Sequence, residues 1–171
     1  MTTVTDNVEL IKKDRLRFSK NKLSSNLTLL AIVFNAIYFV SIYKSDVGSY
    51  YYTFLIGISI IYNLLFMLTA FLSSEGVKSY KLNYSFVLLG LGVGQIIRIF
   101  ILPMSAHNVS ITLGQETQRV MSDGQFMRIC VYLIASAALC IIAGIVAYIK
   151  TRTLTSYEAE LEQKAKGAGH E

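Results

Sequence analysis

Residues 82–102 read LNYSFVLLGLGVGQIIRIFIL, and this stretch decides the class of fold. Arg98 is its only charged residue. An α-helix rises about 1.5 Å per residue, so a stretch of this length can cross a hydrocarbon core about 30 Å thick. Because the bilayer core offers the backbone no water to bind, a helix is the expected spanning form.

Three further apolar segments flank this stretch, at about residues 23–43, 50–72 and 126–149. Hydrophobic residues make up 53% of the chain and charged residues only 16%, and the mean hydropathy is +0.49. This composition is typical of a protein that crosses the membrane several times. We therefore predict an all-α membrane protein with four transmembrane helices.

The lysines and arginines predict the orientation. Twelve of the sixteen would lie on one side of the membrane, in residues 1–22, in the loop after the second helix and in residues 150–171. Cytoplasmic segments carry such an excess of basic residues. The sequence thus predicts a basic cytoplasmic N-terminal segment (1–22), a transmembrane domain (23–149) and a cytoplasmic tail (150–171) in the inner (plasma) membrane.

The loop at 103–125 is predicted to lie outside the cell. Val109, Ile111 and Leu113 alternate with polar residues, a pattern that favours a strand. A turn at Gly114 and Gln115 would lead into a return strand and make a small extracellular β-hairpin. The alternative is a loop without regular structure.

The two cytoplasmic ends have helical patterns. Val8, Ile11, Leu16 and Phe18 lie near helical spacing among basic residues, as in an amphipathic helix on an anionic membrane surface. The alternative is a solvated topology signal, and a third possibility is a docking segment for a signalling or assembly partner. The tail is predicted to continue the last helix to about Lys166.

Two arginines lie inside the apolar segments. Arg98 precedes the outer helix end at Leu102 by four residues, or about 6 Å, which a long side chain can span by snorkelling to the interface. Arg128 lies near the outer start of the last helix. We therefore interpret both as boundary residues. The alternative is a carboxylate from the outer loops, an acidic residue of another subunit, a lipid phosphate or an anionic solute as partner. The loop carboxylates in question are Asp46, Glu116 and Asp123.

Small and amide side chains within the helices indicate packing sites. Gly90 and Gly94 form a small-xxx-small face that permits close approach of a second helix. Asn35 and Asn63 lie at similar depths and are expected to hydrogen-bond between the first two helices. Gln95 shares a face with Arg98. An alternative role for these polar residues is to line a path for a solute.

Several function classes find no support in the sequence. No Asp, Glu, Lys or His lies in a helix interior, where a coupled pump would need a proton or ion relay. No Cys/His group has metal-ligand spacing, and no nucleophile–base pair is visible. The basic residues flank apolar helices rather than form a nucleic-acid motif. We expect no enzyme, no cofactor and no nucleic-acid partner.

Three stretches carry a resemblance to a known family: SIYKSDVGSYYYTFLIGISIIYNLLFML (41–68), RIFILP (98–103) and SDGQF (122–126). From about Phe18 to Tyr157 the chain resembles small bacterial four-helix integral membrane proteins associated with sugar ABC-transporter components. The resemblance implies a non-catalytic accessory subunit of a membrane complex, with the bilayer and other subunits or copies of itself as partners. A small homo-oligomeric channel or solute transporter is the alternative.

Overall fold

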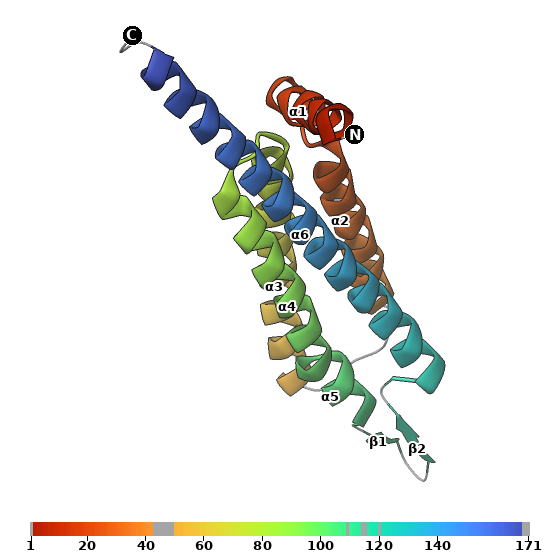
Figure 1. Ribbon diagram of the computed structural model, residues 1–171. Helices are drawn as coiled ribbons and strands as arrows, with labels where there is room; N and C mark the ends of the chain where they lie inside the picture. The colour runs from red at the N-terminus through yellow and green to blue at the C-terminus, as the bar shows by residue number, and fades with distance from the viewer. Residues whose placement is uncertain (1, 43–49, 109, 114–115, 120, 169–171) are drawn as a thin grey trace.

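The structure is a computed structural model that describes residues 2–42, 50–108, 110–113, 116–119 and 121–168. Figure 1 shows long helices that run side by side, with two short strands at one end. In chain order the elements are α1 (Thr2–Phe18), α2 (Lys22–Ile42), α3 (Tyr50–Lys78), α4 (Leu82–Ile101), α5 (Pro103–Asn108), β1 (Ser110–Leu113), β2 (Glu116–Arg119) and α6 (Asp123–Ala168).

Within the described residues, four helices are long and apolar enough to cross a membrane. The spans are Lys22–Ile42, Gly57–Lys78, Leu82–Asn108 and Asp123–Lys166. The predicted set of four such helices is therefore confirmed, and the chain has the character of a multi-pass membrane protein.

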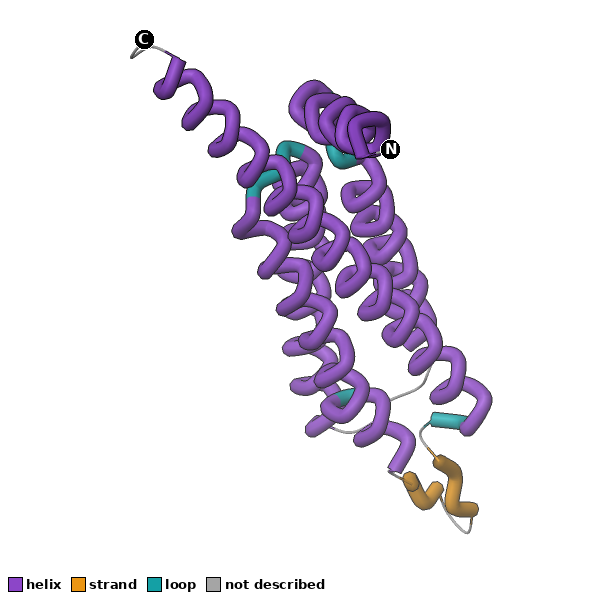
Figure 2. Tube along the Cα trace, viewed as in Figure 1, coloured by secondary structure: helices purple, strands orange, loops and turns teal. Residues whose placement is uncertain are grey.

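The four long helices form a closed ring in the order α2, α3, α4 and α6. Helix α6 packs most extensively against α4 and α2, while α3 contacts α2 and α4. Figure 2 shows this bundle as continuous helix, with short loops at its ends. We call the end that bears α5, β1 and β2 the strand end, and the opposite end, where α1 lies, the basic end.

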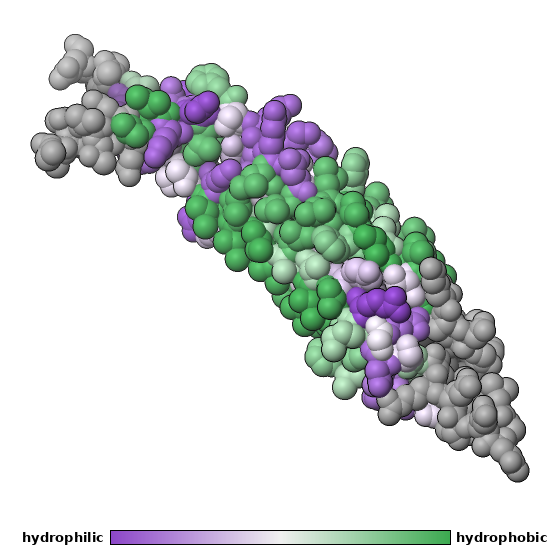
Figure 3. Space-filling model, turned by 90° about the vertical axis from the view of Figure 1, so that its right-hand side faces the viewer, coloured by the Kyte–Doolittle hydropathy of each residue, from purple (hydrophilic) through white to green (hydrophobic). Residues whose placement is uncertain are grey.

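Side chains are distributed over the bundle in the reverse of a soluble protein. The buried faces carry mostly small and polar residues, such as Thr28, Asn35, Ser73 and Ser136. The outer faces carry large aliphatic and aromatic residues, and Figure 3 shows them as a hydrophobic zone between two more hydrophilic ends. Helices in lipid associate through close packing and hydrogen bonds rather than through burial of apolar area, so this distribution fits a bilayer environment.

Spacing along the helices explains which residues meet. On α2 the buried positions Thr28, Ala31, Asn35, Tyr38 and Ile42 follow one another at intervals of three or four residues. Residues at that spacing lie on one face of an α-helix, and the repeat matches the knobs-into-holes packing of bundles. The polar residues of this face are thereby directed to the interior.

Short polar contacts join the helices near the basic end. The hydroxyls of Ser25 and Ser74 lie 2.8 Å apart, and Ser24 Oγ donates to the carbonyl of Ala143. Lys150 Nζ donates to Asn21 Oδ1 at 3.3 Å. These contacts fix α2 against both α3 and α6.

The turn between α3 and α4 has one residue in the left-handed region, Tyr80, with φ 55°. The Lys81 N–H donates to the carbonyl of Gly76 at 3.1 Å and so closes the end of α3. A Cβ on Gly76 would collide with the Tyr84 ring, so glycine is what lets α4 fold back this closely.

Two helices extend past the predicted apolar segments. Helix α3 continues beyond the predicted end near residue 72 to Lys78, and α6 continues to Ala168, in agreement with the prediction that the tail extends the last helix to about Lys166. An apolar run marks where the hydrocarbon ends, whereas the helix continues as long as its backbone hydrogen bonds do. The predicted loop at 103–125 also contains α5, a helix that hydropathy did not indicate.

Strands β1 and β2 pair antiparallel, with Ser110 opposite Arg119 and Leu113 opposite Glu116. The predicted turn at Gly114 and Gln115, and Val109, lie outside the described residues. At the other end α1 contacts α6. Its apolar side chains Leu10, Ile11 and Phe18 are exposed.

Candidate functional site

Arg98 lies at the centre of the candidate site, and its side chain is buried in the bundle instead of snorkelling to the interface as expected from the sequence. The residue is 5% exposed and points into the bundle. Its Nη1 donates to Asn35 Oδ1 at 3.2 Å and to Asn63 Oδ1 at 3.3 Å. Its Nη2 donates to Ser59, at 2.9 Å to Oγ and at 3.3 Å to the carbonyl oxygen. One guanidinium thus joins α4 to both α2 and α3.

The direction of α4 explains this placement. Side chains on an α-helix lean toward the N-terminal end of their own helix. Helix α4 runs toward the strand end, so the side chain of Arg98 leans back toward the middle of the bundle. Its helical face is also a buried one, because Gln95 and Leu88 on the same face are fully buried.

The amide groups of the site form one hydrogen-bonded network. The expected bond between Asn35 and Asn63 is present, with Asn35 Nδ2 donating to Asn63 Oδ1 at 2.7 Å. Gln95 Nε2 donates to Asn35 Oδ1 at 2.9 Å and to Ser136 Oγ at 3.4 Å. Ser136 Oγ in turn donates to the carbonyl of Ala31 at 2.9 Å. All four long helices therefore contribute to the network.

Two tyrosine rings enclose the guanidinium. The Arg98 Cζ atom lies 4.4 Å from the centroid of the Tyr38 ring and 4.9 Å from that of the Tyr62 ring. At these distances the negative faces of the rings attract the cation, by about 2 kcal/mol where water is excluded. The rings and the neutral acceptors together offset part of the cost of removing a charge from water.

The glycines of α4 have separate roles rather than one shared face. A Cβ on Gly94 would lie 2.7 Å from the Tyr62 hydroxyl, so this glycine makes room for the ring over Arg98. No atom lies within 4 Å of a Cβ placed on Gly90. The close approach of α4 to α6 instead involves Gly92, opposite Ile141, and Gly144, opposite Leu89.

A cavity of about 310 Å³ opens beside the site, between α3 and α4. Its described lining is apolar apart from the edge of the Arg98 cluster. The lining residues are Ile58, Ser59, Tyr62, Gly94, Ile97, Arg98, Ile101 and Leu102.

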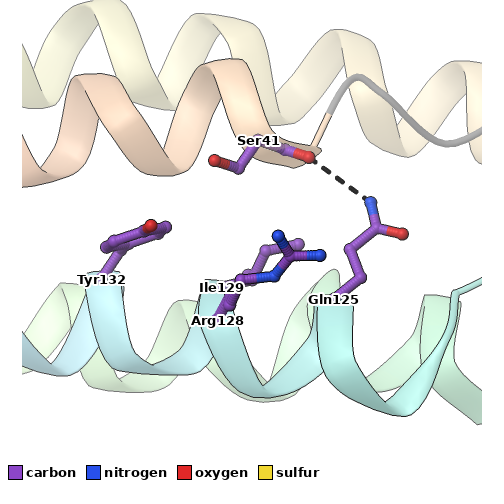
Figure 4. A pocket seen from close by; sticks show the side chains of 5 residues that line it. All are labelled: Ser41, Gln125, Arg128, Ile129 and Tyr132. Atoms are coloured by element: carbon purple, nitrogen blue, oxygen red, sulfur yellow. Dashed lines mark hydrogen bonds between the residues drawn. The ribbon is translucent and has the colours of Figure 1, made fainter.

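Arg128 is placed quite differently. It is exposed near the start of α6, where its Nε donates to the carbonyl of Gly124 at 3.2 Å. It lines a second cavity, between α2 and α6 (Figure 4). Of the carboxylates considered as arginine partners, Asp123 Oδ1 lies 2.9 Å from His107 Nε2, and the side chains of Asp46 and Glu116 lie outside the described part of the chain.

Sequence reasoning missed four members of the cluster: Ser59, Ser136, Tyr38 and Tyr62. A signal for two of them was present, since Ser59 precedes Asn63 by four residues and Tyr38 follows Asn35 by three. Such pairs share a helix face. Ser136 and Tyr62 depend on the rotation of α6 and α3 in the bundle, which spacing alone does not fix.

The cluster is made of a guanidinium, side-chain amides, hydroxyls and phenol rings, which hydrogen-bond to one another and pack around the cation. No group of three His, Cys, Asp or Glu residues that could hold a metal occurs in the described part of the chain. Within that part, Gln95 Oε1 is a buried acceptor without a hydrogen-bond partner.

Comparison of the chain with protein-family models, curated proteins and solved structures gave no match.

Proposed function

We propose that this protein is a non-catalytic accessory or structural subunit of a bacterial membrane complex. The observation that supports the proposal is the hydrogen-bonded network around Arg98. The network joins polar groups from four helices inside the bundle and ties those helices together. A bundle held in this way presents its outer, lipid-facing surfaces to a partner as rigid elements.

The proposed orientation places the basic end in the cytoplasm and the strand end outside the cell. Basic side chains at the first end, such as Lys22, Lys78, Lys81 and Lys150, support this assignment through the positive-inside rule. In this arrangement α1 lies on the cytoplasmic leaflet, with Leu10, Ile11 and Phe18 in the lipid and its lysines and arginines near the headgroups. The paired strands β1 and β2 form a small outer cap.

The resemblance of residues 41–68 and 98–103 to transporter-associated membrane proteins points to a sugar ABC importer as the complex. The uninterrupted apolar surface of α3 supports contact with a second membrane protein, since Ile61, Leu64, Leu65 and Leu68 are all more than half exposed. Neither an active site nor a solute path is needed for this role.

A pull-down of the tagged protein in mild detergent tests the proposal. Stoichiometric recovery of transporter permease and ATPase subunits, identified by mass spectrometry, is the expected result. A variant with Leu64→Asn and Leu68→Asn on the outer face of α3 should lose the partner while it keeps its own melting temperature. A chain that elutes alone in several mild detergents would contradict the proposal.

A second candidate function is a small homo-oligomeric channel or solute transporter. The specific observation in its favour is the cavity of about 310 Å³ beside Arg98, which brings a cation and the hydroxyl-bearing side chains of Ser59 and Tyr62 to the edge of an open space. This role predicts solute flux into liposomes that changes with Arg98→Lys, a variant that retains the charge. Liposomes that stay tight to sugars, anions and cations would exclude it.

A further inference from the structure

The cavity beside Arg98 is not the only one that contains an arginine. A second cavity, of about 220 Å³, lies near the strand end between the last turn of α2 and the first turns of α6. Its described lining consists of Ser41, Gln125, Arg128, Ile129 and Tyr132, and we call it the Arg128 pocket. Figure 4 shows the guanidinium of Arg128 in the space between the two helices.

The donors of Arg128 are directed to this pocket. Its Nε is held by the carbonyl of Gly124 at 3.2 Å, which fixes the plane of the guanidinium. The two terminal nitrogens donate to no residue in the part of the chain that the structure describes. They form a planar fork, a geometry that matches two oxygens of a phosphate or carboxylate group.

Hydrogen bonds hold the residues at the rim of the pocket in place. Gln125 Nε2 donates to the carbonyl of Ser41 at 3.4 Å, one of the last carbonyls of α2 that lack a partner within their own helix. Ser41 Oγ donates to the carbonyl of Ile37 at 2.7 Å. These bonds hold the end of α2 over the start of α6.

The nearest acid on the same helix faces away. Asp123 precedes Arg128 by five residues, which at 3.6 residues per turn places it on nearly the opposite side of α6. There it contacts His107 of α5, with Oδ1 and Nε2 2.9 Å apart. An anion in the pocket therefore meets the cation rather than this carboxylate.

An apolar groove of about 420 Å³ lies along the outer side of α2. Ser41 lines both spaces. The side chains of Val33 and Val40 in the groove are 51% and 61% exposed. The groove residues are Ile32, Val33, Ala36, Ile37, Val40 and Ser41.

We propose that the Arg128 pocket binds the phosphate of an anionic phospholipid, with one acyl chain in the groove on α2. A cation at the end of a transmembrane helix, next to an apolar groove, matches both parts of such a lipid. The guanidinium of Arg128 donates to two phosphate oxygens, and the groove covers the part of the acyl chain that is next to the headgroup. A free phosphate ester would satisfy only the first part. A zwitterionic lipid carries its own cation next to the phosphate, and this cation would weaken the attraction of the phosphate to Arg128.

Native mass spectrometry of the detergent-solubilised full chain tests this assignment. The probes are phosphatidylglycerol, phosphatidylcholine of the same acyl length, and glycerol 3-phosphate. Phosphatidylglycerol should bind at one site, about tenfold or more tightly than the other two, because charge-assisted hydrogen bonds and the chain both contribute.

The matched variants are Arg128→Gln and Arg152→Gln. Both remove one positive charge from an exposed position of α6, but Arg152 lies near the opposite end and contacts Tyr148. Arg128→Gln should weaken phosphatidylglycerol binding about tenfold, whereas Arg152→Gln should leave it unchanged. Equal losses in the two variants would show general attraction to net charge and would overturn the proposal.

Ala36→Phe tests the chain-binding part, because the larger side chain fills the groove without a change in charge. Weaker binding of phosphatidylglycerol in this variant is expected. Equal binding of glycerol 3-phosphate and phosphatidylglycerol would identify a site for a soluble phosphate, and equal binding of phosphatidylcholine would exclude selectivity for anionic lipid. Either result would overturn the assignment.

Discussion

Arg98 and Arg128 are the same kind of residue near the same end of the bundle, yet one is buried and the other exposed. Arg98 belongs to the last turns of α4, which runs toward the strand end, and Arg128 to the first turns of α6, which runs away from it. Each side chain leans toward the start of its own helix. Arg98 therefore turns into the bundle, and Arg128 turns toward the bundle end.

The environments of the two guanidinium groups follow from the opposite directions of α4 and α6. Arg98 contacts Asn35, Asn63 and Ser59 and lies between two tyrosine rings. Arg128 keeps the terminal part of its side chain at an open pocket. The comparison teaches that depth along a helix is not enough to assign an arginine to the interface, because the direction of the helix decides whether snorkelling is possible.

The largest expected effect comes from removal of Arg98, and removal of Arg128 supplies the comparison. Arg98→Ala leaves the Asn35 and Asn63 oxygens without their cation and creates a cavity, so we expect a loss of about 2–4 kcal/mol of unfolding free energy. Arg128→Ala should change it by less than about 0.5 kcal/mol. Unfolding in mixed micelles of mild detergent and SDS measures both. Similar losses in the two variants would show that the two arginines do not differ in burial.

The next effect concerns the glycines of α4. Gly94→Ala places a Cβ 2.7 Å from the Tyr62 hydroxyl and should cost about 1–2 kcal/mol. Gly90→Ala meets no atom within 4 Å and should be neutral or slightly stabilising, because alanine favours the helix.

Tyr62→Phe supplies the control for this pair of variants. Because it removes the hydroxyl that Gly94→Ala would contact, the double variant should lose less stability than the sum of the two single variants. Thermal melting in detergent measures the difference. Additive losses would indicate that the contact at Gly94 is not the source of the effect.

A smaller effect is expected for the asparagine pair. Asn35→Leu and Asn63→Leu each disturb the Arg98 network, so the informative quantity is their coupling in a double-mutant cycle. Hydrogen bonds between membrane helices average about 0.6 kcal/mol, and a coupling near 1 kcal/mol is expected here because Arg98 binds both side chains. A coupling near zero would show that the two asparagine side chains do not interact in the folded protein.

The smallest effect belongs to the contact between His107 and Asp123, which joins α5 to α6 close to the Arg128 pocket. The Asp123 side chain is 79% exposed, so the pair is screened by water. His107→Ala should reduce the stability by about 0.5 kcal/mol or less and should speed hydrogen exchange of α5 amides. A large loss would mean that the strand end contributes to stability as much as the Arg98 cluster does.

The sequence was sufficient for those features that depend on composition or on one pair of helices. Apolar length located the four spans, and similar depth on adjacent antiparallel helices located the bond between Asn35 and Asn63. Hydropathy was a poor guide to helix ends, because α3 and α6 continue into polar sequence where backbone hydrogen bonding persists.

The rest required the three-dimensional arrangement. The small-xxx-small spacing of Gly90 and Gly94 was visible in the sequence, but only the rotation of α4 shows that Gly94 faces Tyr62 and that Gly92 faces α6. The burial of Arg98 depends on acceptors from α2 and α3, which are 63 and 35 residues away in the sequence, respectively. No local pattern records contacts of that separation.

Hydrogen exchange of the arginine side chains is a direct test of whether Arg98 is buried and Arg128 exposed. Arginine-selective ¹⁵N labelling in detergent micelles gives guanidinium signals, which Arg98→Lys and Arg128→Lys assign by loss of a peak. We expect the terminal N–H protons of Arg98 to exchange with water much more slowly than those of Arg128. Equally fast exchange at the two arginines would contradict burial of Arg98 in the centre of the bundle.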